Sequence, residues 1–516
     1  MNQSTMPVEA KTLFGHPVGL FVLFFTEMWE RFSYYGMRAL FVLFLTATIT
    51  SDNPGWGWED SDAIGLYKWY TTLVYVASIP GGILADKIFG QKKMVMIGGF
   101  LLCIGHLILA INSPTAFYAG LGFIIAGVGG LKPNISSMVG GLYRKGDSRR
   151  DVGFTIFYIG INIGAFLAGI IIGSVGENIN WHYGFGLAGI GMLFGQIIFI
   201  WGRKYLKDVG NFTGAEESKD RELMKRPLTS IEKDRMKVLF LSFAIIIVFW
   251  GAFEQAGGLM NIYAKEKTDR LTSLMNVNII LLLITAGILA RGLFLRIKNK
   301  AASNTWLIGA LVIAAIFALL KFFVFNTDPF EVPATWFQSV NAFFIFTLGL
   351  PVALFWVWWE KHGKENSSLF KMGLGVIIMG LGFVFMAKAS MDFESTGSSA
   401  MTWLILAYLF HTIGELCASP VALSFITKLA PVKYAAFMMG AYFAATGLGN
   451  FLAGSIGEQI KNFSELQLFT SITIFCVVFG ILVLLILKPL KRLTHGAEDN
   501  EGTNFDEAEG FELADQ

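Results

Sequence analysis

The stretch "FFTEMWERFSYYGMRAL", residues 24–40, places charged side chains inside an apolar run that is long enough to cross a membrane. The charged residues are Glu27, Glu30, Arg31 and Arg38. A charge at the centre of a bilayer costs about 2.5 to 3.5 kcal/mol, so intramembrane charges are usually functional. With about 100° between successive helical residues, three of these four and Tyr34 fall within a sector of about 60°, and Glu30 lies beside it. We therefore expect a polar stripe on the first helix that faces a central cavity. In the alternative, Glu27 and Arg31, four residues apart, pair only to ease insertion.

The composition is that of a membrane protein. Hydrophobic residues make up 54% of the 516 residues, charged residues only 15%, and 48 residues are Phe. Apolar runs of about 20 residues, which match the thickness of the hydrocarbon layer, recur along the chain. We predict an all-α membrane protein. Its fourteen spans are expected at about 17–48, 62–87, 92–111, 116–143, 152–176, 182–204, 237–264, 272–297, 303–326, 332–359, 367–390, 400–427, 433–457 and 465–488.

Lysine and arginine are concentrated in alternate loops. Cations follow the second, fourth, eighth, tenth and last predicted spans, whereas "TSDNPGWGWEDSD" and "NSPT" on the other side contain none. The positive-inside rule assigns the cation-rich side to the cytoplasm. We therefore expect a multi-pass protein of the cell inner membrane with both termini in the cytoplasm. The loop "KEKTDR", residues 265–270, is an exception, because it places cations on the outer side.

The spans divide into two halves. We predict an N-terminal six-helix bundle at 1–204 and a C-terminal bundle at 237–491 that includes two extra spans at about 272–326. Residues 205–236 have the length and mixed charge of a cytoplasmic linker. Residues 492–516 are acidic and nearly free of aliphatic side chains, which predicts a disordered cytoplasmic tail.

Further charges lie inside other spans. They are Lys132 in "GLKPN", Glu254 in "FWGAFEQAGG" and Glu415 in "HTIGELCASP". Together with the first helix they give three cations and four carboxylates, so one carboxylate lacks a counter-charge. In a low-dielectric cavity such a group favours its protonated form, which makes it a candidate proton carrier. The alternative is a closed set of structural ion pairs.

Uncharged polar and aromatic side chains on several spans are candidates for the lining of one amphipathic pocket. Individually, such residues more often form helix-packing hydrogen bonds. His411 precedes Glu415 by four residues and shares its helix face; it either tunes that carboxylate or bonds a neighbouring helix. The candidate lining residues are Tyr34, Tyr35, Tyr75, Asn162, Trp250, Asn341 and Ser419.

The sequence lacks the motifs of several nucleotide-binding, metal-binding and hydrolytic proteins. The sequence contains no G-x-x-x-x-G-K-[ST] phosphate loop, no H-E-x-x-H, no paired Cys-x-x-Cys and no G-x-S-x-G. Its three cysteines, Cys103, Cys417 and Cys476, all lie inside apolar runs, which argues against disulfides and zinc. The net charge of +2 gives no reason to expect a nucleic-acid partner. We expect no metal site, no nucleic-acid binding and no enzymatic activity.

Motifs along the chain resemble those of known transporters. "GGILADKIFGQKK", residues 81–93, resembles the loop signature between helices two and three of the major facilitator superfamily. A finer resemblance is to the proton-dependent oligopeptide transporter (POT/PTR) family. "EMWERF" fits its E-x-x-E-R motif and "GLKPN" fits its fourth-helix lysine motif. Matches to the fifth, seventh, eighth and tenth family helices are "FTIFYIGINIGAF", "FEQ", "FQSVN" and "GELCASP".

The resemblance implies a major facilitator fold of two six-helix bundles, here with two extra helices, and transport by alternating access. It implies that Arg38 pairs with Glu254 to close an outer gate, and that Lys132 pairs with Glu415 to close the inner side. Protonation of carboxylates would loosen a gate pair and couple transport to the proton gradient. The implied proton-coupling residues are Glu27, Glu30, Arg31 and Glu254.

The expected function is proton-coupled import of di- and tripeptides by a monomer in the lipid bilayer, with protons as the coupling ion and no other cofactor. A peptide is a zwitterion, so its carboxylate suits Arg38 and Lys132, and its ammonium group suits Glu415 and nearby amides. The amides are those of Asn162 and Asn341, and the apolar walls would be Tyr35, Tyr75, Trp250 and Tyr442. Two alternatives remain: a carrier of another small solute, such as nitrate, on the same fold, and a membrane enzyme or peptide-sensing receptor.

Two features depart from the family pattern. Bacterial members commonly carry two extra helices between family helices six and seven, whereas here the additional spans fall between seven and eight. Tyr442 stands where some members have Trp, and the second-helix histidine of animal members is missing. Proton coupling is therefore expected to rest on carboxylates.

Overall fold

Apolar helices of membrane-spanning length build the molecule. Ten described helices are long and apolar enough to cross a membrane. The first helix, α1 (Val18–Thr46), is not among the ten although it has 29 residues, because it carries the four charges quoted above. The computed structural model describes residues 11–143, 147, 149–212, 227–297, 307–311, 314–315, 318, 328–431 and 434–497.

The N-terminal bundle packs around α1. This helix contacts α6 and α7 along much of its length, and α4 packs against both α5 and α7. Small residues allow the close approach of α4 and α5, since a Cβ atom added at Gly98 would lie 2.6 Å from the carbonyl oxygen of Gly127. The elements after β1 (Thr12–Leu13), β2 (His16–Pro17) and α1 are α2 (Asp60–Val76), α3 (Ser78–Leu84), η1 (Ala85–Phe89), α4 (Gln91–Leu109), α5 (Pro114–Gly141), α6 (Arg149–Asn178), α7 (Trp181–Gly202) and η2 (Arg203–Leu206).

The C-terminal bundle packs around α14, which contacts α9, α15 and α17. Its elements are α9 (Ser230–Phe253), η3 (Glu254–Gly257), α10 (Leu259–Glu266), β3 (Thr268–Asp269), η4 (Ala334–Trp336), α13 (Phe337–Lys361), α14 (Ser368–Thr396), β6 (Ser399–Ala400), α15 (Met401–Leu429), α16 (Ala435–Gly457), η6 (Glu458–Lys461), α17 (Glu465–Leu485) and α18 (Leu487–Leu493).

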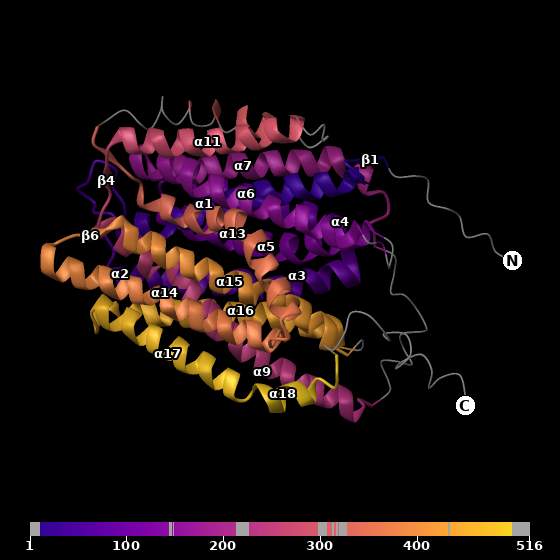
Figure 1. Ribbon diagram of the computed structural model, residues 1–516. Coiled ribbons are helices and arrows are strands. Elements are labelled where there is room, and N and C mark those ends of the chain that lie inside the picture. The colour runs from indigo at the N-terminus through magenta and orange to yellow at the C-terminus, as the bar shows by residue number, and fades with distance from the viewer. Residues whose placement is uncertain are drawn as a thin grey trace, which may run out of the picture.

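The two bundles meet along two seams. α2 packs against α16, and α6 packs against α13. The helices run roughly side by side, and β1 and α18 lie toward the same end of the molecule (Figure 1). We call the end near β1 and α18 the inner end. The opposite end, where β4 (Leu271–Thr272) and β6 lie in Figure 1, is called the outer end.

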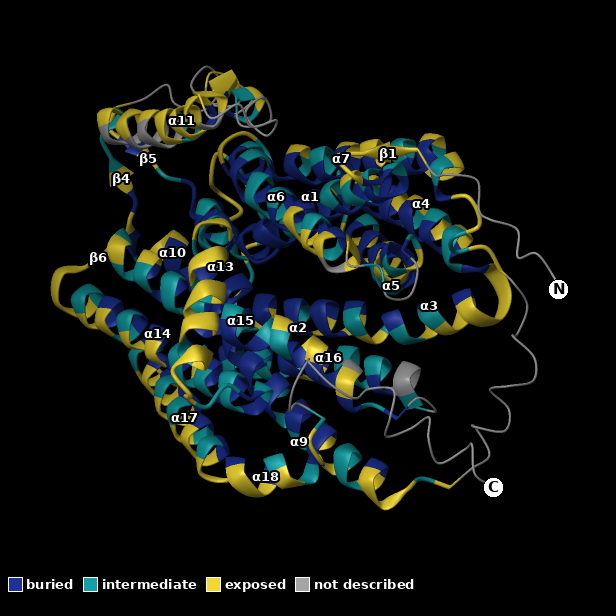
Figure 2. Ribbon diagram, turned by 45° about the vertical axis from the view of Figure 1, so that its right-hand side comes forward, coloured by how far each residue is buried: buried dark blue, intermediate teal, exposed yellow. Residues whose placement is uncertain are grey.

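The segment between α10 and η4 leaves and rejoins the core through a small ribbon. Strand β4 pairs antiparallel with β5 (Phe330–Glu331), with Thr272 opposite Phe330. Beyond β4 the chain forms α11 (Leu274–Ile297), which lies at the periphery of the molecule (Figures 1 and 2). The extra sequence therefore lies between family helices seven and eight, as predicted.

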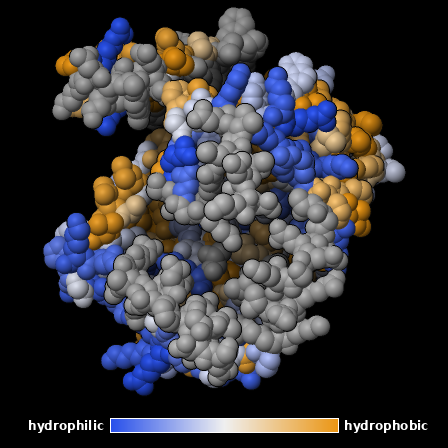
Figure 3. Space-filling model, turned by 90° about the vertical axis from the view of Figure 1, so that its right-hand side faces the viewer, coloured by the Kyte–Doolittle hydropathy of each residue, from blue (hydrophilic) through white to orange (hydrophobic). Residues whose placement is uncertain are grey.

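Large apolar side chains cover the outward faces. Helix α17 exposes Phe475, Leu482 and Leu485, with exposed fractions of 54%, 53% and 73%. Figure 2 shows exposed residues on the outer faces of α13, α14 and α17 and buried ones between the helices. Figure 3 looks onto the inner end, where hydrophilic residues gather and hydrophobic ones lie along one flank. Exposed apolar helix faces of this size suit contact with lipid.

The predicted spans agree with the structure except at a few points. Every predicted span other than 303–326 coincides with a described helix. Span 303–326 lies largely outside the described residues, so the count of fourteen stays a prediction. The predicted tail also lies outside them from residue 498 onward.

A helix begins inside the segment predicted as the linker, residues 205–236. Helix α9 begins at Ser230 because Thr229 and Glu232 form a capping box. The Thr229 amide donates to Glu232 Oε2 at 2.8 Å, and the Glu232 amide donates to Thr229 Oγ1 at 3.2 Å. The signature T-x-x-E is visible in the sequence, but the polar first turns of α9 do not look like part of a span.

Candidate functional site

The charged cluster on α1 is buried and incompletely paired. Glu27, Glu30 and Arg31 are at most 3% exposed. Arg31 Nε lies 3.0 Å from Glu27 Oε1 and also donates to Glu30 Oε2. Glu27 Oε2, Glu30 Oε1 and one terminal nitrogen of Arg31 have no hydrogen-bond partner. Two carboxylates thus share one guanidinium, which leaves oxygen atoms available for a proton.

Arg38 joins the two bundles seven residues farther along α1. Its terminal nitrogens lie 2.5 Å and 3.4 Å from the two carboxylate oxygens of Glu254, the first residue of η3. Both side chains are at most 8% exposed. Arg38 Nε also donates to the hydroxyl of Tyr67 on α2. The predicted contact between Arg38 and Glu254 is therefore formed, and it links the N-terminal to the C-terminal bundle.

Lys132 and Glu415, predicted to pair, do not pair in this structure. Lys132 Nζ lies 3.8 Å from the ring centroid of Tyr75, and no described carboxylate is within ion-pair distance of it. Glu415 Oε2 instead accepts a hydrogen bond of 2.8 Å from Asn341 Nδ2, which also donates to Thr412. Lys132 in the N-terminal bundle therefore has no carboxylate partner among the described residues, and Glu415 in the C-terminal bundle has no cationic partner among them.

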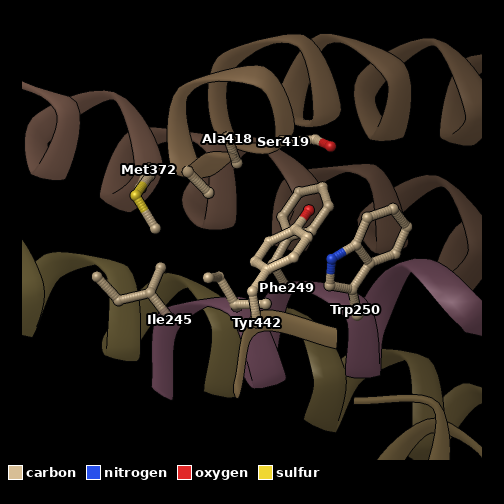
Figure 4. A pocket seen from close by; sticks show the side chains of 9 residues that line it. Ile245, Phe249, Trp250, Met372, Ala418, Ser419 and Tyr442 are labelled. Atoms are coloured by element: carbon tan, nitrogen blue, oxygen red, sulfur yellow. The ribbon is translucent and has the colours of Figure 1, made fainter. Parts of the chain in front are cut away.

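Three predicted lining residues share one pocket in the C-terminal bundle. Trp250, Ser419 and Tyr442 line a small cavity of about 10 Å³, room for about one water molecule, together with apolar side chains. Trp250 and Ser419 lie at one side of it, and Ile245 and Met372 lie at the other (Figure 4). The remaining lining residues are Ile246, Phe249, Ala418 and Ala422. The lining of this cavity is mainly apolar.

Other predicted lining residues lie elsewhere. Tyr34 is 2% exposed and its ring stacks on Tyr70 inside the N-terminal bundle. Tyr35 is partly exposed, with its ring 5.9 Å from the Arg31 guanidinium and 5.8 Å from that of Arg38. Asn162 is 4% exposed and donates to the carbonyl of Tyr158 on its own helix.

His411 forms neither of the contacts considered for it. Both ring nitrogens lack a hydrogen-bond partner, and the side chain is 1% exposed. Its ring lies 4.5 Å from the ring of Phe383, between centroids. His411 is therefore an aromatic packing residue in this arrangement.

The sequence analysis missed a fourth intramembrane cation. Lys68 lies on α2, is 8% exposed, and its Nζ lies 2.6 Å from Glu458 Oε2 of η6. The count of three cations against four carboxylates is therefore wrong. Glu458 follows the predicted end of its span by one residue, so the pair was not considered. The surplus survives only among the central residues, where Glu27 and Glu30 share Arg31.

The arrangement suits a zwitterionic solute more than a reaction. Cations and carboxylates face each other from two bundles, and a small apolar pocket lies beside them. Among the described residues there is no group of three His, Cys, Asp or Glu side chains that would hold a metal ion. The chemistry offered is charge recognition and proton uptake.

Comparisons with known proteins agree with this arrangement. The POT family profile matches residues 92–226 and 313–474. The uncharacterized transporter YclF of Bacillus subtilis (strain 168) is 36% identical over 501 residues, covering 95% of this chain and 97% of the relative. A di-/tripeptide transporter of Lactococcus lactis subsp. cremoris is 34% identical over 506 residues, covering 94% and 97%.

Solved structures share the fold over nearly the whole chain. A peptide transporter POT in complex with sulfate superposes with a TM-score of 0.76 at 29% identity, covering 94% of this chain and 97% of the other. A POT family transporter in complex with 5-aminolevulinic acid gives a TM-score of 0.77 at 27% identity, covering 94% and 99%.

Proposed function

The chain belongs to the POT family of transporters, and on this premise we propose that it imports di- and tripeptides together with protons by alternating access. The observation that carries the proposal is the buried ion pair between Arg38 and Glu254, which joins the bundles where a zwitterion would separate them. The similarity to a di-/tripeptide transporter over 94% of the chain supports the substrate class.

Substrate recognition is assigned to charges on both bundles. The peptide carboxylate binds Arg38 and Lys132, and the ammonium group binds Glu415 with Asn341. Each contact is a charge-assisted hydrogen bond, roughly twice as strong as a neutral one. Trp250, Ser419 and Tyr442, which line the small apolar cavity, are assigned to contact with a peptide side chain once that cavity widens.

Proton coupling is assigned to the carboxylates that share cations. A proton on Glu27 or Glu30 lowers the negative charge around Arg31, and a proton on Glu254 weakens its hold on Arg38. Peptide carboxylate then competes for the released guanidinium. The protein is proposed to act as a monomer in the cell inner membrane with both termini in the cytoplasm, because the cations of the loops cluster on that side.

The test is uptake of dialanine into proteoliposomes with an acidic and with a neutral external medium. We expect acid-stimulated uptake that Glu27→Gln and Lys132→Ala each abolish. The matched controls are Asp392→Asn and Lys388→Gln, which break an exposed ion pair on α14 and should leave uptake unchanged. Absence of acid-stimulated dialanine uptake together with acid-stimulated nitrate uptake would contradict the peptide assignment and favour a carrier of another solute.

A further inference from the structure

Glu177, on the last turn of α6, is a buried carboxylate whose partners among the described residues are in the other bundle. Its side chain is 1% exposed. Oε1 lies 3.1 Å from Lys265 Nζ and 3.6 Å from a terminal nitrogen of Arg270. Both cations belong to the outer loop "KEKTDR", the exception to the charge distribution. Their presence outside is explained by this contact.

Backbone amides complete the binding of Glu177. Oε1 accepts a hydrogen bond of 3.0 Å from the amide of Ala334, and Oε2 accepts one of 3.2 Å from the amide of Thr335. These amides open η4 and would otherwise lack partners within a helix. One carboxylate of the N-terminal bundle thus satisfies two cations and two amides of the C-terminal bundle.

Neighbouring contacts tie the bundles at the same end. Trp336 Nε1 donates to Ser174 Oγ at 2.8 Å, one turn before Glu177. On the α2 side, Lys68 and Glu458 form an ion pair, and Asn261 Nδ2 donates to the carbonyl of Ala39 at 2.9 Å. These contacts join the bundles near the Arg38 pair and between it and the outer end. Opening the outer end would break them together.

Arg270 also connects this region to the inserted segment. One terminal nitrogen donates to the Val332 carbonyl at 2.5 Å, and the other to Glu331 Oε1 at 2.5 Å. Glu331 belongs to β5, half of the ribbon through which the insertion leaves the core. The base of the insertion and Glu177 therefore bind the same guanidinium.

We propose that Glu177 is the outer latch of the carrier, a positioning residue whose release from Lys265, Arg270 and the η4 amides is required for the outer end to open. The proposal rests on the proposed function, because a latch of this kind needs a carrier that opens alternately. It adds a second layer of closure outside the Arg38–Glu254 pair.

The experiment measures the outer end directly, in the full chain and without substrate. The three native cysteines are replaced by serine, and spin labels are attached at Tyr183→Cys and Phe463→Cys, which are exposed positions in opposite bundles. Pulsed electron paramagnetic resonance then gives the distribution of distances between the labels. We expect one dominant short distance in the parent, and a several-fold larger long-distance population in Glu177→Ala.

Matched variants separate the latch from general destabilisation. Glu177→Gln keeps an oxygen for one amide but loses the charge, so it should give an intermediate distribution. The control Glu331→Gln alters the exposed partner of Arg270 and should leave the distribution as in the parent. If Glu177→Ala fails to fold, Lys265→Met with Arg270→Met removes both ion pairs of Glu177 from the other side and leaves its two amide hydrogen bonds.

Two outcomes overturn the proposal. One is an unchanged distance distribution in every foldable variant that removes the Glu177 contacts. The other is an equal shift in Glu331→Gln. Absence of dialanine uptake by the parent protein, with the distances responding as expected, would reject the proposed substrate and leave the latch standing.

Discussion

The outer and inner ends of the seam between the bundles are held differently. At the outer end, Arg38–Glu254, Lys68–Glu458 and the contacts of Glu177 each cross from one bundle to the other. At the inner end, no ion pair joins the bundles among the side chains that the structure describes. Lys132 and Glu415, the two residues with charges suited to that role, bind Tyr75 and Asn341 instead. Among the described side chains, charge pairs therefore join the bundles at the outer end and not at the inner end.

The difference shows how ion pairs can close one end of a carrier and still allow that end to open. A buried ion pair gains Coulomb energy but loses hydration, so its net contribution to stability is small when it is complete. Removing only one of its two partners strongly destabilises the protein, because the other charge is left buried without a counter-charge. An end of the carrier that is closed by an ion pair can therefore open, provided that a proton or a charged group of the substrate replaces the partner that each residue loses.

The largest expected effect comes from removing one partner of the central outer pair. Arg38→Met leaves Glu254 buried without a cation, which costs ~3 to 5 kcal/mol. Thermal unfolding in detergent should show a strongly reduced midpoint, and dialanine uptake should be lost. Adding Glu254→Gln should restore much of the midpoint and none of the uptake. An unchanged midpoint in Arg38→Met would contradict the structural role of the pair.

A smaller effect is expected at the centre of the C-terminal bundle. Asn341→Ala removes the amide that donates to Glu415, and a buried acceptor left without its donor costs ~1 to 3 kcal/mol. The unfolding midpoint should fall, and the apparent KM for dialanine should rise. The control is Asn462→Ala, which removes an exposed amide bonded to Gln459. Equal effects of the two variants would show that the Asn341 contact does not matter.

Nearer the inner end, a substitution of Lys132 should change substrate binding without changing stability. Lys132→Gln breaks no ion pair, so the unfolding midpoint should change little, while the apparent KM for dialanine should rise by about tenfold, which corresponds to ~1.4 kcal/mol. Titrating initial uptake rates against dialanine concentration measures the shift. A lowered midpoint with an unaltered KM would make Lys132 a packing residue and break the contrast between the two ends.

The smallest effect is expected at the N-terminal cap of α9, near the inner end. Thr229→Ala removes the hydroxyl that caps α9, at a cost of ~1 kcal/mol. The unfolding midpoint should fall slightly and the KM for dialanine should stay the same. Thr229→Ser, which keeps the hydroxyl, should match the parent; a changed KM in Thr229→Ala would link this end to substrate binding.

Periodicity and length predicted most of the fold, because each span must be long and apolar whatever its neighbours are. The contact between Arg38 and Glu254 was predicted differently. The two residues are 216 positions apart, and only the resemblance to a transporter family placed them together. The separation of Lys132 from Glu415 was not predictable, since one sequence must encode both the open and the closed inner end.

Two of the three residues that the sequence analysis missed lie just beyond the ends of the predicted spans. Glu177 and Glu458 each follow the end of a predicted span by one residue, so the intramembrane count excluded them. Lys68 lies inside the predicted span 62–87, but it was not included among the intramembrane charges. A count that includes one helical turn beyond each span would have paired all three with cations or carboxylates on the opposite bundle.

The pairing of β4 with β5 has a consequence for how the chain is assembled. Thr272 and Phe330 are opposite each other in an antiparallel ladder, so the core continues across the point where the insertion begins and ends. A two-residue Asn-Gly turn joins such strands readily. Replacing residues 273–329 by that turn should therefore leave a shorter carrier in which Thr272 still pairs with Phe330.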